Sequence, residues 1–228
     1  MIRHLLQLIW NQRKQNAWLW AELLLVSVFL WFLVDYLYVM GRTYTAPLGF
    51  DIRHTYSIVI SSLSERSPDY IPKEKRERPD GVHLLTALDR IRTYPGVESA
   101  CLTDGGMPYY MGSRNLVWRI DTLQVPCRYA FVTPEFFDVF RIYDKEGETA
   151  SLKRAIEDNN SIVISADVET MNPGLSLLGQ KAYRGNVTDE IEETIRGISV
   201  PIRRHEYNQG GTNVYRALRL SRMEEGYY

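Results

Sequence analysis

The sequence predicts an α+β protein, in which one N-terminal transmembrane helix precedes a mixed α/β domain outside the cytoplasm. The first observation is an apolar run over residues 17–40. The second is that short β-branched segments alternate with segments of helical period from residue 55 onward. The third is a composition of 45% apolar and 12% aromatic residues among 228, which is typical of a folded domain. We therefore expect three regions, 1–16, 17–40 and 41–228.

Residues 1–16 predict an amphipathic helix that lies on the cytoplasmic membrane surface. Apolar side chains recur there at helical spacing, while Arg3, Gln7, Asn11 and Lys14 occupy the other side. The alternative is an ordinary solvated flank that extends the spanning helix into the cytoplasm.

Residues 17–40, AWLWAELLLVSVFLWFLVDYLYVM, are long enough to cross a bilayer as a helix. At about 1.5 Å per residue such a helix spans about 36 Å, whereas the hydrocarbon core is about 30 Å thick. Within this run, charge is confined to Glu22 and Asp35, one near each end. Aromatic residues at both edges are typical of membrane interfaces. These interface residues are Trp18, Trp20, Tyr36 and Tyr38.

Two other interpretations of this run compete with a spanning helix. A cleaved signal peptide would have an apolar region of about 7–15 residues followed by a small-residue cleavage site. Residues 38–42, YVMGR, contain no such site. A buried core helix would need a large core around all of its faces. We therefore favour the spanning helix.

Basic residues predict the orientation of the chain. Arg3, Arg13 and Lys14 precede the run without any acidic residue, and positive residues prefer the cytoplasmic side of a membrane. We expect the N-terminus in the cytoplasm and residues 41–228 outside it.

The first part of the outer domain predicts a βαβ-like unit. β-Branched residues indicate a strand at 55–63, and apolar residues at helical spacing indicate a helix at 82–94. Pro95-Gly96 ends that helix, and residues 97–103 indicate a second strand.

The rest of the domain is expected to mix short strands and helices. Thr133 is expected to cap a short helix with Pro134 at its first position. Asp104 lies in a Gly-rich loop, where a role in the turn outweighs a catalytic one. The other expected elements are a helix at 151–157 and strands at 116–120, 125–132, 161–165, 181–183, 194–198 and 202–204.

Composition and motifs argue against several classes of function. A net charge of −1 gives no electrostatic case for nucleic-acid binding. The four histidines are scattered without metal-ligand spacing, and the sequence contains no phosphate-binding loop and no nucleophile or zinc-protease motif. We expect no catalytic, cofactor-binding or metal residues, and no enzymatic activity.

Cys101 and Cys127 leave two alternatives open. They can form a disulfide if the domain lies outside the cytoplasm, or they can remain free buried thiols. Two cysteines without paired spacing do not predict a metal site.

Residues 128–140, RYAFVTPEFFDVF, resemble a segment in the periplasmic core domain of MacB/FtsX-type ABC transporter permeases. In that family a strand leads into a turn and a helix with the pattern V-[TS]-P-x-F-F-x-[VT]-[FL]. The positions that match are Val132, Thr133, Pro134, Phe136, Phe137, Val139 and Phe140.

Other parts of the family pattern follow in the same order at 162–165, 177–180 and 195–200. The sequence departs from the family at Ala166, where an acidic residue is usual, and Asp167 stands one position later. The resemblance covers most of residues 1 to 205. Its further matching positions include Ile164, Ser165, Gly179 and Gly197.

The resemblance implies a MacB-like periplasmic core with a porter-like βαβ unit and a second small subdomain, in a bacterial inner membrane. It also implies a non-catalytic permease that relays motion to this domain. A separate cytoplasmic ABC ATPase would bind ATP, so this chain itself would hold no cofactor. The expected partners are the lipid bilayer, that ATPase, and a homodimeric permease partner or a periplasmic protein. The matching residues would be structural.

The family has further spanning helices after this domain, whereas the sequence ends at Tyr228 without another apolar run. We therefore expect a permease fragment, a truncated permease or a single-span relative. The competing hypothesis is a single-pass sensor or anchored binding module, and an anchored enzyme is a weaker third. The sequence does not predict the transported substrate.

Overall fold

The computed structural model divides the chain into two units, Met1–Ala46 and Pro47–Tyr228. It describes residues 3, 4, 7, 10, 17–59, 63–72, 75, 77, 79–110, 112, 114–158, 160–184, 191–208 and 210–219. The amphipathic helix predicted for residues 1–16 lies outside the described residues, apart from four single positions.

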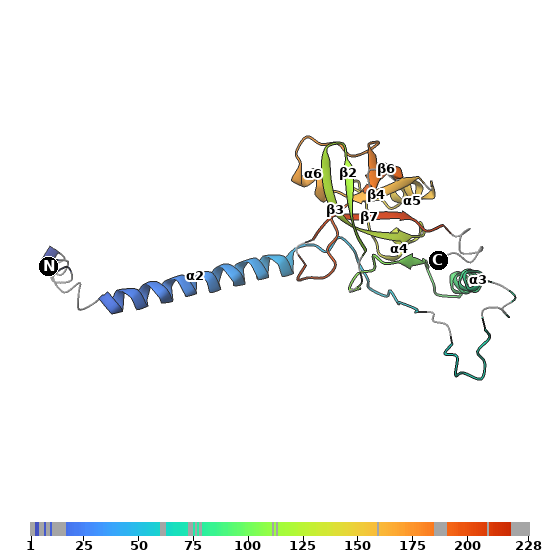
Figure 1. Cartoon of the computed structure of the whole chain (residues 1–228), viewed down its shortest axis with the longest axis horizontal. Helices are drawn as coiled ribbons and strands as arrows, with labels where there is room; N and C mark the ends of the chain where they lie inside the picture. The colour runs from blue at the N-terminus through green and yellow to red at the C-terminus, as the bar shows by residue number, and fades with distance from the viewer. Residues whose placement is uncertain are drawn as a thin grey trace. The chain divides into compact units, whose positions relative to one another are not determined.

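The first unit contains helix α2, Ala17–Thr45, which includes the whole predicted apolar run (Figure 1). None of its 29 residues is buried. A helix that exposes apolar side chains on every face requires an apolar environment around it. Within the described residues, α2 is the one helix long and apolar enough to cross a membrane. The Ser27 hydroxyl donates to the Leu23 carbonyl at 2.7 Å, so this polar group is satisfied inside the helix.

The second unit is built around a closed six-stranded barrel. The strands pair in the order β1-β3-β2-β5-β6-β4-β7, and β3 pairs in parallel with β7, which closes the sheet without β1. Strand β1 pairs instead with the end of β3. The strands are β1 Thr103–Asp104, β2 Arg114–Ile120, β3 Leu123–Val132, β4 Ser161–Ser165, β5 Lys181–Arg184, β6 Ile191–Ser199 and β7 Asn213–Ala217.

Side chains alternate between two cores along the barrel strands. On β4, Ile162 and Ile164 pack into a cluster with Trp118 of β2 inside the barrel, whereas Val163 packs into a second cluster. The second cluster also takes residues from α4 and α5, on the other face of the sheet. The helices of this unit are α3 Asp80–Arg92, α4 Phe136–Val139, α5 Ala150–Glu157 and α6 Asp167–Met171.

The predicted βαβ unit is wrong, although its helix is present as α3. Residues 55–59 form no strand, 60–62 lie outside the described residues, and among 97–103 only Thr103 joins a strand. The side chains of Tyr56 and Val59 are 86% and 85% exposed. A β-branched sequence forms a strand when a half-buried sheet surface accepts it, and no described strand pairs with 55–59.

The later predictions are confirmed for α5 and for β2 to β6. The strand predicted at 202–204 is wrong, because the Arg203 amide donates to the Leu48 carbonyl at 2.9 Å and its side chain bonds a neighbouring loop. Helix α6 and strand β7 were not predicted from the sequence. Strand β7, NVYRA, has no clear alternation of apolar and polar residues, because Arg216 is buried in an ion pair inside the barrel.

Candidate functional site

The phenylalanines of the family-like segment form one buried aromatic cluster. Phe136 and Phe137 are completely buried on α4, and Phe140 follows directly. The Tyr215 ring from β7 lies 5.4 Å from that of Phe136 and 5.6 Å from that of Phe137. Val132 is buried at the end of β3, and Val139 packs against the same cluster. These residues hold helix α4 on the barrel, and their geometry offers no chemistry.

Thr133 does not cap the helix as the sequence predicts. Helix α4 begins at Phe136, and no side chain caps it. The Thr133 hydroxyl instead accepts a hydrogen bond from the Leu102 amide at 3.2 Å, while the Thr133 amide donates to the Leu102 carbonyl at 3.0 Å. Thr133 thus holds the segment that leads into β1, and it does not cap the helix. Pro134 lies in the turn before the helix and not at its first position.

Two of the other matching positions make specific contacts. The Ser165 hydroxyl donates to Asp167 at 2.7 Å and accepts from the Asn213 amide at 2.9 Å. A Cβ atom on Gly197 would lie 2.8 Å from Val163 Cγ2. Glycine therefore lets β6 approach its neighbours more closely than any other residue would. Ile164 is buried inside the barrel, and Gly179 lies in the turn before β5.

The remaining predicted residues do not meet in a site. Trp18, Trp20, Tyr36 and Tyr38 are all exposed along α2. Cys101 and Cys127 are both free thiols, so the structure contains no disulfide between them. Burial raises the pKa of each thiol to about 12, which keeps both protonated and unreactive at neutral pH.

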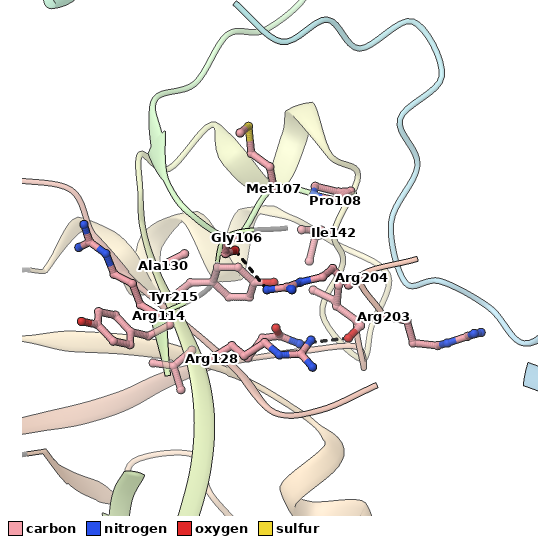
Figure 2. A pocket seen from close by; sticks show the side chains of 15 residues that line it. Gly106, Met107, Pro108, Arg114, Arg128, Ala130, Ile142, Arg203, Arg204 and Tyr215 are labelled. Atoms are coloured by element: carbon pink, nitrogen blue, oxygen red, sulfur yellow. Dashed lines mark hydrogen bonds between the residues drawn. The ribbon is translucent and has the colours of Figure 1, made fainter. Parts of the chain in front are cut away.

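A pocket lined by four arginines is the candidate site, and the sequence analysis did not predict it (Figure 2). Arg114 and Arg128 come from β2 and β3, while Arg203 and Arg204 come from the loop before β7. Its volume is about 30 Å³, and Met107, Ala130, Ile142 and Tyr215 contribute apolar surface. The described residues that line it include no Asp or Glu.

Three of these arginines have partners in the protein. Arg203 is 7% exposed, and its guanidinium donates to the Asn208 carbonyl at 2.7 Å. Arg114 forms an ion pair with Asp104 at 2.8 Å. Arg204 donates to the Gly112 carbonyl at 3.2 Å. These contacts hold the two loops of the pocket to each other and to the barrel.

The side chain of Arg128 differs from the other three. Among the residues that the structure describes, none forms a hydrogen bond or ion pair with its guanidinium, although the side chain is half-buried. Burial and the neighbouring charge of Arg128 both lower the pKa of Arg204. The pocket thus holds uncompensated positive charge. Positions 114, 128, 203 and 204 share no local sequence spacing that would predict a site. The pocket could have been predicted only from the pairing of β3 with β7, which brings the loop before β7 next to β3.

Comparison with known proteins gives partial structural matches. The periplasmic region of MacB from Actinobacillus actinomycetemcomitans is 10% identical with a TM-score of 0.40, over 58% of this chain and 54% of that one. The extracellular domain of the ABC-type transporter YknZ from Gram-positive bacteria is 13% identical with a TM-score of 0.42, over 62% and 65%. This chain therefore spans between half and two thirds of their lengths. No protein-family model and no curated protein matches the chain.

Proposed function

We propose that this chain is a membrane subunit, a permease or part of one, of a MacB/FtsX-type ABC transporter that relays ATPase-driven motion to an extracytoplasmic domain. The resemblance of residues 128–140 supports the class. The fully exposed apolar helix α2 supports a place in the membrane. The relay itself rests on how the chain continues after that helix.

The observation that carries the proposal is the connection at residues 48–51. It follows α2 by two residues and is bonded into the outer domain. The Leu48 carbonyl accepts from Arg203 at 2.9 Å, and the Asp51 amide donates to the Phe140 carbonyl at 2.9 Å. Gly49 has φ +81, and a Cβ atom there would lie 2.1 Å from the Pro201 carbonyl oxygen. These bonds make residues 48–51 part of the fold of the outer domain, so the chain enters that domain directly after α2.

A pull-down from the native host tests this proposal. The full chain is extracted in detergent through an affinity tag, and the proteins that accompany it are identified. Co-purification of a cytoplasmic ABC ATPase, lost when residues 1–16 are removed, would support a transporter subunit. Recovery of the chain without any ATPase would contradict it.

The second candidate function is a single-pass, membrane-anchored binding module. One observation favours it: the arginine pocket holds the half-buried guanidinium of Arg128, which has no hydrogen-bond or ion-pair partner in the described part of the chain. Recovery of the chain with extracytoplasmic partners alone would support this function.

A further inference from the structure

We infer that the pocket between β3 and residues 106–108, 112, 202–204 and 213 is a binding site for a single carboxylate group, which pairs with the guanidinium of Arg128. This inference rests on the pocket alone. It holds for a permease and for an anchored binding module alike.

The first argument is charge. Four arginines line the pocket, and the described lining residues include no carboxylate. The guanidinium groups of Arg114 and Arg203 are bonded to Asp104 and to the Asn208 carbonyl, so the pocket's positive charge comes chiefly from Arg128 and Arg204. The two acidic residues nearest in the chain are already engaged, Asp104 with Arg114 and Glu206 with the hydroxyl of Tyr109. Residues 111, 113 and 209, which lie outside the described part of these loops, are Met, Ser and Gln and carry no charge. An anion would therefore meet uncompensated positive charge.

Arg128 combines a fixed backbone with a guanidinium that has no partner among the described residues. Its backbone is fixed on β3, where the Arg128 amide donates to the Thr212 carbonyl at 2.9 Å. The guanidinium forms no hydrogen bond or ion pair with any residue that the structure describes, and it lies close enough to Arg204 to lower the pKa of that residue. Burying a charge without a partner is costly, and proteins retain such a group when a ligand supplies the counter-charge.

The third argument is size and geometry. A water molecule needs about 10–15 Å³ of cavity, so a pocket of about 30 Å³ accepts about two water-sized groups. A carboxylate presents two oxygens in one plane, and a guanidinium binds them through two parallel hydrogen bonds. A phosphate or sulfate carries further oxygens, which would lie toward the open rim and gain no second guanidinium fork like that of Arg128. The exposed residues Gly112 and Arg114 stand at its rim, so a ligand can enter from solvent.

The experiment is thermal unfolding of the purified full chain in detergent, titrated with sodium acetate against sodium chloride at equal ionic strength. Because a ligand that binds the folded state stabilises it, acetate should raise the melting temperature above that in chloride. Arg128→Gln should weaken acetate binding at least about tenfold, since it removes a charged hydrogen-bond donor. Arg154→Gln removes an exposed arginine outside the pocket and should leave the acetate effect unchanged.

Two further arms identify the ligand. Acetyl-Gly-Glu-Gly-amide is compared with acetyl-Gly-Gln-Gly-amide, which lacks only the carboxylate. Tighter binding of the glutamate peptide than of acetate would assign the site to a peptide side chain. Tighter binding of acetate would assign it to a small free carboxylate.

Three results would overturn the inference. Inorganic phosphate could bind as tightly as acetate, acetate could raise the melting temperature no more than chloride does, or the effect of acetate could be undiminished in Arg128→Gln. Loss of the acetate effect in Arg128→Gln counts only if that variant melts cooperatively in chloride. If it does not, Arg128→Lys replaces it, because that change keeps the charge and removes the bidentate geometry.

Discussion

At the scale of single residues, two groups of side chains can be distinguished. One group is buried and stabilises the fold, and the other is accessible to a ligand. Phe136 and Phe137 of the segment 128–140 belong to the first group, because their rings are buried against each other and against that of Tyr215 from β7. Arg128 lies in the same segment and belongs to the second group. A single short motif therefore contains both a structural core and the candidate ligand-binding group.

Replacing Phe137 by alanine tests the structural role of the motif. The side chain is completely buried, so Phe137→Ala should lower the free energy of unfolding by about 3–5 kcal/mol. Chemical denaturation of the full chain in detergent measures this. Tyr56→Ala, at an exposed aromatic residue, is the control and should change stability little. Equal stability of the two variants would contradict the assigned core.

Two neighbouring glutamates on β6 test the buried ion pair inside the barrel. Glu193 is 2% exposed and accepts hydrogen bonds from the guanidinium of Arg216, whereas Glu192 pairs with Lys181 at the surface. Glu193→Gln should cost about 3–5 kcal/mol because it leaves a buried charge without a partner. Glu192→Gln should cost less than about 1 kcal/mol, since exposed ion pairs contribute little. Both are measured by denaturant unfolding, and similar losses would argue against a buried pair.

At the scale of elements, the turn before α5 is organised by a carboxylate. Asp144 accepts from the amides of Glu146 and Glu148, each at 2.9 Å, and from the Ser151 hydroxyl. Burial opposes ionisation of this group, but these hydrogen bonds outweigh it and lower the pKa of Asp144 below its ordinary value of 3.8. A lowered pKa means that the ionised carboxylate stabilises the folded state.

The pH dependence of stability follows from that shift. The contribution of Asp144 is fully present above its unfolded pKa and is lost as pH falls through its lower folded pKa. Asp144→Asn should therefore destabilise the domain near neutral pH, and its stability should approach that of the wild type under acid conditions. Unfolding measured across the acid range tests this, with the exposed Asp69→Asn as control. A constant difference between wild type and Asp144→Asn at all pH values would refute it.

Elements with clear sequence signals were predictable, and those that depend on distant partners were not. Strand β4 was found because SIVIS is almost entirely apolar, and it is buried on both faces. The segment 55–59 has an equally strong strand signal but no described neighbour to pair with. Strand β7 has a weak signal and is nevertheless a strand, because β3 and β4 both pair with it. The arginine pocket depends on that same long-range pairing.

At the scale of the whole molecule, an apolar helix precedes a barrel domain, and the first residues of that domain, 48–51, are bonded to Arg203 and Phe140 within it. The side of the membrane on which the domain lies is predicted from charge alone, because basic residues precede the helix. This orientation determines whether the arginine pocket can meet an extracytoplasmic ligand.

Cysteine labelling tests that orientation directly. The two native thiols should react little with the maleimide, because burial raises their pKa values to about 12 and the protonated thiol is a poor nucleophile. Arg154→Cys places a thiol on the exposed surface of α5, and Gln7→Cys places one before α2. A membrane-impermeant maleimide should label Arg154→Cys in cells whose inner membrane is intact, and should label Gln7→Cys after lysis alone. The reverse pattern would place the barrel in the cytoplasm, on the same side of the membrane as the proposed ATPase. A motion relayed through α2 to an extracytoplasmic domain would then be impossible, so the labelling decides whether the transporter mechanism is open to this chain at all.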